Sequence, residues 1–119
     1  MFKAKHLSPM IPSFNLPRTV SFFTDLLDFK IGRDDKTYVI LFKDHLTVHI
    51  LRAGEEIGEM DCYLEVDDVG NVWEKIRNKL EGIKHKAPFD REYGMREIHI
   101  SIPETKTLLF IGQVIGAHP

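Results

Sequence analysis

Side chains that could bind or transform a small molecule fall at every second position of two short segments. Asp61, Tyr63 and Glu65 alternate with apolar residues, and Glu97 and His99 do the same in a later segment. Because successive side chains of a β-strand point to opposite faces, each set is expected to share one face of a sheet. Such faces present carboxylates, a phenol and an imidazole, which can hold a ligand, move a proton or bind a metal.

Aromatic side chains form the second group of candidates. Several of them lie in the two strands predicted within residues 38–51 and in the strand predicted near the end of the chain. Flat aromatic faces hold planar heterocycles by stacking, and a tyrosine face also attracts a cation. The alternative is that some of these tyrosines only pack the sheet. The candidate ligand-binding residues are Tyr38, Phe42, His49, Asp61, Tyr63, Glu65, Tyr93, Glu97 and Phe110.

Two amphipathic helices are predicted to support these strands, over residues 16–27 and 69–80. Asn15 is a favoured N-cap residue for the first, and Asp67 or Asp68 for the second. Both segments repeat apolar residues at spacings of three and four, which predicts one buried stripe on each helix.

The helices belong to an internal repeat with an offset of 53 residues. The matched pairs are Asn15 with Asp68, Phe23 with Ile76, and Leu27 with Leu80. Each half then carries three further strands, and residues 53–59 form the linker. The pattern predicts an α+β fold of two tandem βαβββ modules, with curved mixed sheets that form a cleft. The modules span about 1–52 and 60–113 of a single domain over 1–119, with a frayed tail at 116–119.

Composition narrows the function classes. The chain has 119 residues, a formal net charge of −2 and a pI of about 6.3, which argues against nucleic-acid binding. The densest basic spot, 84–86, is interpreted as a solvated strand edge. No apolar run is long enough for a membrane span, and the first residues lack a secretory signal. The single cysteine, Cys62, is typical of a reducing compartment, so we expect a cytoplasmic protein.

Other catalytic arrangements have weak support. Alternation places Cys62 on the helix-facing side of its strand, where a small buried thiol is unreactive. Ser8, His49 and Asp61 could make a serine–histidine–aspartate set, but no nucleophile-elbow sequence accompanies them. Glu97 is interpreted as the partner of Arg96 in a structural ion pair at the cleft rim, with an acid–base role as the alternative.

Two motifs carry a resemblance to a known superfamily. They are Pro9-Met10-Ile11-Pro12 followed by the segment 20–29, and Glu92-Tyr93-Gly94-Met95-Arg96-Glu97-Ile98. The chain resembles the vicinal-oxygen-chelate superfamily of glyoxalase I, extradiol dioxygenases and bleomycin-resistance proteins, and the bleomycin-resistance proteins most of all. Two turns depart from that pattern. Leu27-Asp28-Phe29 stands in place of Leu-Gly-Phe, and Ile102-Pro103-Glu104-Thr105 in place of Asp-Pro-x-Gly.

The resemblance also implies where a metal would bind. Metal-dependent members place four ligands at positions that match Ser8, His49, Asp61 and Phe110. Phenylalanine cannot bind a metal and serine is a poor ligand, so two protein ligands would remain, fewer than working sites use. We therefore expect no metal and no other cofactor. Ligands from His6, Glu65 or His99 are the alternative.

The sequence favours a non-catalytic protein that binds and sequesters a small planar or cationic molecule, as bleomycin-resistance proteins do. The resemblance places Tyr38, Tyr63 and Tyr93 at ligand-stacking positions, and implies a homodimer with two clefts. Some dimers of this kind exchange their first strand, a role that would suit the apolar residues Leu7 and Ile11. The alternatives are a metal-dependent lyase, isomerase or dioxygenase of the superfamily, and a module that binds another protein through a sheet edge.

Overall fold

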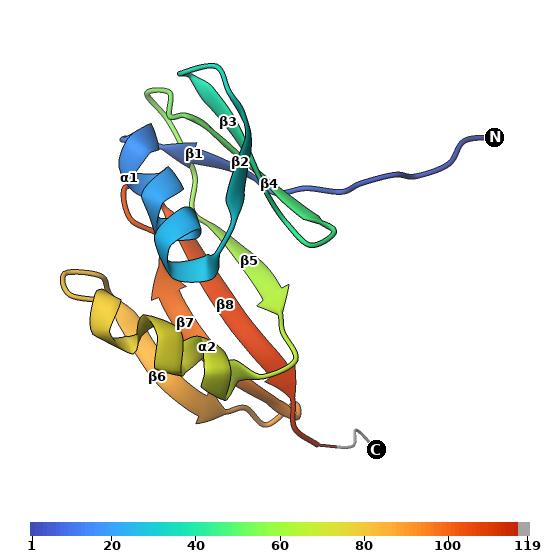
Figure 1. The fold of residues 1–119 in the computed structure, drawn as a ribbon, viewed down its shortest axis with the longest axis vertical. Coiled ribbons are helices and arrows are strands. Elements are labelled where there is room, and N and C mark those ends of the chain that lie inside the picture. The colour runs from blue at the N-terminus through green and yellow to red at the C-terminus, as the bar shows by residue number, and fades with distance from the viewer. Residues whose placement is uncertain (117–119) are drawn as a thin grey trace.

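A computed structural model describes residues 1–116 of the chain, and of the predicted frayed tail only Gly116 lies within that part. The first module contains β1 (Met10–Ser13), α1 (Leu16–Ser21), η1 (Phe22–Leu26), β2 (Lys30–Asp34), β3 (Tyr38–Lys43) and β4 (Leu46–Arg52). The second contains β5 (Met60–Glu65), α2 (Val69–Ile76), η2 (Arg77–Lys79), β6 (His85–Asp90), β7 (Met95–Ser101) and β8 (Thr107–Val114). Figure 1 shows the two modules one above the other.

Each module builds one four-stranded sheet with the same strand order. The first sheet has the order β1-β4-β3-β2 and the second β5-β8-β7-β6. In each sheet one pair is parallel, β1 with β4 and β5 with β8, and the remaining pairs are antiparallel. The α+β fold of two βαβββ modules is therefore confirmed. The segment that joins them runs from residue 53 to 59, as the sequence predicts.

Both helices begin at the predicted caps. The Asn15 side chain accepts a hydrogen bond from the backbone N–H of Arg18 at 3.3 Å, and Asp68 accepts one from Asn71 at 3.0 Å. The first helix continues as the π-helical turn η1, and the second ends in the 3-10 turn η2. The extent of both helices is as predicted, whereas the winding of their last turns is not visible in the apolar spacing.

The core lies between the helices and one face of each sheet. Every second residue of the inner strands is buried there, including Ile50, Ile98 and Ile111, together with Phe23 and Ile76 from the helices. These residues belong to one continuous hydrophobic cluster that includes both modules. The two halves therefore pack against each other within the chain. One helix and one sheet alone could not bury all of their apolar surface.

Contacts between the modules join the first helix to the turn before β8. The backbone N–H of Phe14 donates to the carbonyl oxygen of Glu104 at 2.8 Å. The buried hydroxyl of Thr19 donates to the carbonyl oxygen of Pro103, also at 2.8 Å. At the other end of the helix, Lys75 pairs with Asp28 at 3.0 Å. Asp28 has a φ of 61°, which explains why the family pattern that this sequence resembles has glycine at this position.

Within residues 1–116, no helix is long and apolar enough to cross a membrane. Residues 1–7 are all exposed, Leu7 fully, and the start of the chain runs away from the body of the molecule (Figure 1).

The N-cap of α2 provides a test of the residue at which this helix begins. Replacement of Asp68 by alanine removes the acceptor for the Asn71 N–H, so the free energy of unfolding should fall by about 1 kcal/mol. Urea unfolding measures the change. The matched control is Asp67→Ala. Asp67 is the preceding residue and is exposed, so its replacement should leave the unfolding midpoint nearly unchanged. Equal losses in the two variants would contradict the assignment of Asp68 as the cap.

Candidate functional site

The face of the second sheet opposite α2 carries most of the candidate residues. Along β5, Asp61, Tyr63 and Glu65 are exposed, while Cys62 and Leu64 are partly buried against the core. The predicted alternation is thus confirmed for this strand. The same face of β7 and β8 carries Glu97, His99 and Phe110. The residues that alternate with them, Ile98, Ile100, Leu109 and Ile111, are buried.

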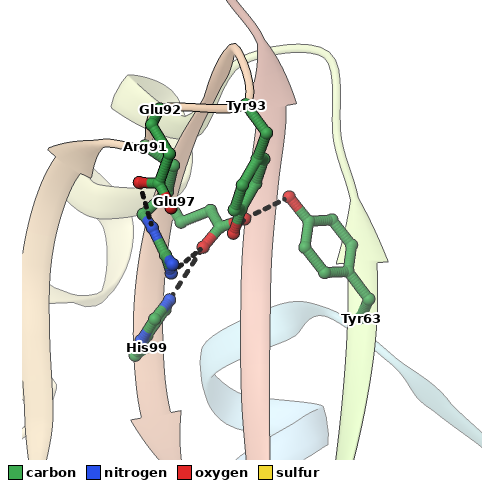
Figure 2. Close-up of polar contacts among 6 residues, drawn as sticks. All are labelled: Tyr63, Arg91, Glu92, Tyr93, Glu97 and His99. Atoms are coloured by element: carbon green, nitrogen blue, oxygen red, sulfur yellow. Dashed lines mark hydrogen bonds and ion pairs between the residues drawn. The ribbon is translucent and has the colours of Figure 1, made fainter.

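Glu97 lies at the centre of this face, and its side chain is fully buried. One carboxylate oxygen, Oε2, accepts hydrogen bonds from the hydroxyls of Tyr63 at 2.8 Å and Tyr93 at 2.6 Å. The other, Oε1, accepts from Nε2 of His99 at 2.8 Å and from the guanidinium of Arg91 at 3.4 Å. Figure 2 shows these donors converging from β5, from the turn before β7, and from β7 itself.

The hydrogen bonds decide the charge state of this group. Burial raises the pKa of Glu97, but hydrogen bonds from His99, Tyr93 and Tyr63 outweigh burial and hold that pKa below its ordinary value. The carboxylate is therefore ionised at neutral pH. Burial and the hydrogen bond to Glu97 raise the pKa of Tyr63 well above its ordinary value, and the same hydrogen bond, then burial, raises the pKa of Tyr93. Both phenols stay protonated and donate.

A row of aromatic rings crosses the sheet beside Glu97, with one ring from each strand. Phe89 of β6 meets His99 of β7 edge-on, with ring centroids 4.9 Å apart. His99 lies 4.0 Å from Phe110 of β8, which stacks with Tyr63 of β5 at 6.1 Å. Tyr63 is nevertheless 46% exposed and Tyr93 38% exposed. Their hydroxyls are fixed while their rings remain open to a ligand.

The predicted ion pair between Arg96 and Glu97 is wrong. Arg96 pairs with Asp90 at 2.7 Å, because neighbouring residues of a strand point to opposite faces. The cation beside Glu97 is Arg91, whose guanidinium also lies 4.8 Å from the ring centroid of Tyr93.

Sequence reasoning missed Phe89 and Arg91 as parts of this site. A register shift between Lys86 and Phe89 breaks the alternation of β6, so counting every second residue does not bring Phe89 onto the face of Glu97. Arg91 lies just after β6, outside any strand pattern. The only signal for Arg91 was its closeness in sequence to Tyr93 and Glu97.

The first sheet carries a separate group of candidates. The hydroxyl of Tyr38 lies 2.6 Å from Nδ1 of His49, and the two rings meet edge-on. Phe42 is 40% exposed and lies against Gly32. Within residues 1–116, no hydrogen bond joins these side chains to the group around Glu97.

The structure thus brings together Tyr63, Tyr93, Glu97 and Phe110 of the predicted residues. The two remaining acidic candidates border different hollows on either side of Tyr63. Asp61 lines a pocket of about 740 Å³ on the same sheet face, and Glu65 lines one of about 460 Å³ between the modules.

The side chains at the four metal-ligand positions do not fit a metal centre. The ring of Phe110 offers no lone pair, and the Ser8 hydroxyl forms a hydrogen bond with the Thr47 hydroxyl. Nδ1 of His49 is bonded to Tyr38, which leaves Nε2 as its one possible ligand atom, and Asp61 would be the only other ligand of the four. A search of the described residues finds no cluster of three or more His, Cys, Asp or Glu side chains that could hold an ion. Too few donors therefore face one point to bind a divalent cation firmly.

The other catalytic arrangements are not assembled either. Ser8 bonds Thr47 and His49 bonds Tyr38, so these two residues do not form the pair that could activate a nucleophile. Burial and the charge of Asp61 raise the pKa of the Cys62 thiol to about 11. The thiol is protonated at neutral pH, which confirms that its surroundings do not activate it.

Comparison with known proteins establishes the fold. No protein family model matches the sequence, and a search of curated proteins finds no relative. Among solved structures, a bleomycin resistance determinant encoded on the transposon Tn5 is 21% identical with a TM-score of 0.78, over 93% of this chain and 98% of that one. A bleomycin-binding protein complexed with bleomycin is 22% identical with a TM-score of 0.77, over 92% and 98%.

A third structure, a glyoxalase/bleomycin resistance protein/dioxygenase from Nocardioides, is 14% identical with a TM-score of 0.76, over 100% of this chain and 90% of that one. The chain therefore has the fold that the resemblance in its sequence implied. At these identities the likeness concerns the fold alone.

Gly112 of β8 tests how Tyr63 is positioned. A Cβ at residue 112 would lie 2.0 Å from the Tyr63 hydroxyl and 3.2 Å from the Glu97 side chain. Gly112→Ala should therefore push Tyr63 off Glu97 and lower the free energy of unfolding by about 2 kcal/mol. Chemical denaturation followed by circular dichroism gives this value.

Gly58→Ala is the matched control, because a Cβ there meets no atom within 4 Å. Its stability should equal that of the wild type within error. If Gly112→Ala were as stable as Gly58→Ala, the close packing of Tyr63 over β8 would be refuted.

Proposed function

We propose that this protein binds and sequesters a small planar or cationic molecule, without catalysis, in an aromatic-lined cleft between two copies of the chain. The observation that carries the proposal is the pair of exposed tyrosine rings, Tyr63 and Tyr93, held by one buried carboxylate. Likeness in fold to proteins named for bleomycin resistance and bleomycin binding supports it.

Fixed rings favour binding because little freedom is lost when a ligand arrives. A free tyrosine on a surface must be immobilised, whereas Tyr63 and Tyr93 are already oriented by Glu97. Each aromatic contact contributes about 0.5–1.5 kcal/mol beyond the apolar area that it buries. The exposed carboxylate of Asp61, two residues from Tyr63, would attract a cationic ligand.

A homodimer would complete the cleft. The Tyr38, Phe42 and His49 candidates lie on the other sheet, away from the Glu97 group, so a second copy is needed to place one set opposite the other. Large apolar side chains left exposed on the single chain, Met10 and Phe14 among them, support such an association. Ile11 is buried within its own chain, and β1 pairs with β4 there. The proposal that two copies exchange their first strands therefore rests on the exposed residues that precede β1.

We further propose that residues 1–119 act as one domain in the cytoplasm, whose reducing conditions suit the single, half-buried thiol of Cys62. A metal-dependent lyase, isomerase or dioxygenase is not proposed, because the side chains at the ligand positions do not fit the metal that such a reaction needs.

Two measurements on freshly purified, untagged protein test the proposal. Native mass spectrometry without chelator should give a dimer with no stoichiometric divalent ion. Titration of planar cationic compounds, with bleomycin first, should then quench tyrosine fluorescence saturably. Tyr93→Ala should weaken binding at least tenfold, because one wall of the cleft is removed.

Tyr93→Phe serves as the matched variant, since it keeps the ring and loses only the hydroxyl. It should bind within about threefold of the wild type, because Tyr63, His99 and Arg91 still hold Glu97. A monomer, a dimer that carries one divalent ion per cleft, or a folded Tyr93→Ala that binds like the wild type would each overturn the proposal.

A further inference from the structure

A hollow of about 740 Å³ continues the aromatic row toward the far end of the second sheet. His99 belongs to both, since it lines this hollow and lies in the row between Phe89 and Phe110. Ser101 and Leu108 also line the hollow, two register positions farther along β7 and β8. A ligand stacked on the rings would therefore extend into it.

The two sides of this hollow carry opposite charges. Glu59 and Asp61 line it from the β5 side, and Lys84 and Lys86 from the β6 side. In the order β5-β8-β7-β6 these strands are the two edges of the sheet (Figure 1). Three strand spacings separate them, about 14 Å. Two carboxylates thus line one edge of the hollow and two ammonium groups the other, and Lys106 lies near the carboxylate edge beside Ile57.

Register confirms that both lysines face the hollow. Lys86 lies directly opposite His99 in the ladder, so the two side chains share a face. The carbonyl oxygen of Lys84 accepts from the N–H of Ser101, which places Lys84 two residues along on the same side. The ammonium group of Lys86 lies 4.0 Å from the ring centroid of Phe89, at the end of the aromatic row.

These charges lack ion-pair partners, although the ammonium group of Lys86 lies over the ring of Phe89. Among residues 1–116, neither lysine lies within ion-pair distance of a carboxylate, nor do Glu59 and Asp61 reach a cationic side chain. The remaining cation at the rim, Lys106, donates to the carbonyl oxygen of Ile57 at 3.3 Å. A ligand with one cationic and one anionic group would pair with both edges. A purely cationic ligand would be repelled by the lysines.

We infer that the ligand of this cleft is a planar zwitterion. Its flat body lies against the stacked rings of Phe110 and Tyr63. Its cationic group faces Asp61 and Glu59, and an anionic group such as a carboxylate or phosphate faces Lys84 and Lys86. The inference rests on the proposed function, since it assigns the chemical class of the molecule bound at that same site.

A matched pair of planar dyes tests the inference. Rhodamine 19 is a zwitterion at neutral pH, and its ethyl ester, rhodamine 6G, is a cation with the same ring system. Fluorescence anisotropy should show that the wild-type protein binds rhodamine 19 at least fivefold more tightly than rhodamine 6G. The double variant Lys84→Gln/Lys86→Gln should lose this preference and bind rhodamine 6G at least as tightly as the wild type does.

The control is Lys79→Gln, which removes the same charge on the helix side of the sheet and should leave the preference unchanged. Asp61→Asn should weaken both dyes, since both carry the cation. Equal affinity of the wild type for the two dyes would overturn the inference that the ligand is a zwitterion. It would not contradict the aromatic binding site. No binding of either dye by a folded dimer would count against the proposed function as well.

Discussion

The burial of one negative charge, the carboxylate of Glu97, constrains the rest of this structure. Removing a carboxylate from water costs several kcal/mol unless good hydrogen bonds offset that cost. Here four donors do so, and they come from β5, the turn before β7, and β7 itself. The strands must therefore keep one register, and β8 must have glycine at position 112 so that Tyr63 can reach across it. The same constraint fixes the two exposed tyrosine rings.

The internal repeat explains the architecture but not the chemistry. Tyr63 stands opposite Phe110 in the second sheet, as Met10 stands opposite His49 in the first. Equivalent positions thus hold an imidazole in one module and a benzene ring in the other. A symmetric set of metal ligands cannot arise from such a pair. The second module uses the position for stacking, and the first pairs its histidine with Tyr38.

The sequence predicted the fold because its signals are local. Alternation in the strands and the caps Asn15 and Asp68 are readable from neighbouring residues, and the 53-residue repeat shows only that such a local pattern occurs twice. Each of these is confirmed. The site was predicted only in part. The partner of Glu97 was placed at Arg96 because adjacent residues look close in a sequence, although they point to opposite sheet faces. Phe89 escaped notice because the irregular register of β6 shifts it onto the site face. Association between two copies of a chain is not a local property of its sequence, so for the proposed dimer the sequence offers only the family resemblance.

The most direct measurement of the central claim is the free energy of unfolding of wild type and Glu97→Gln as a function of pH. The pKa of Glu97 lies below its unfolded value of about 4.5, so ionisation stabilises the fold above that pH, and the gain is lost as pH falls through the folded pKa. The wild type should therefore exceed Glu97→Gln by about 2 kcal/mol at pH 7, and the gap should close below about pH 4.5. A gap that is absent at pH 7, or that does not change with pH, would contradict the account of an ionised carboxylate that organises the site.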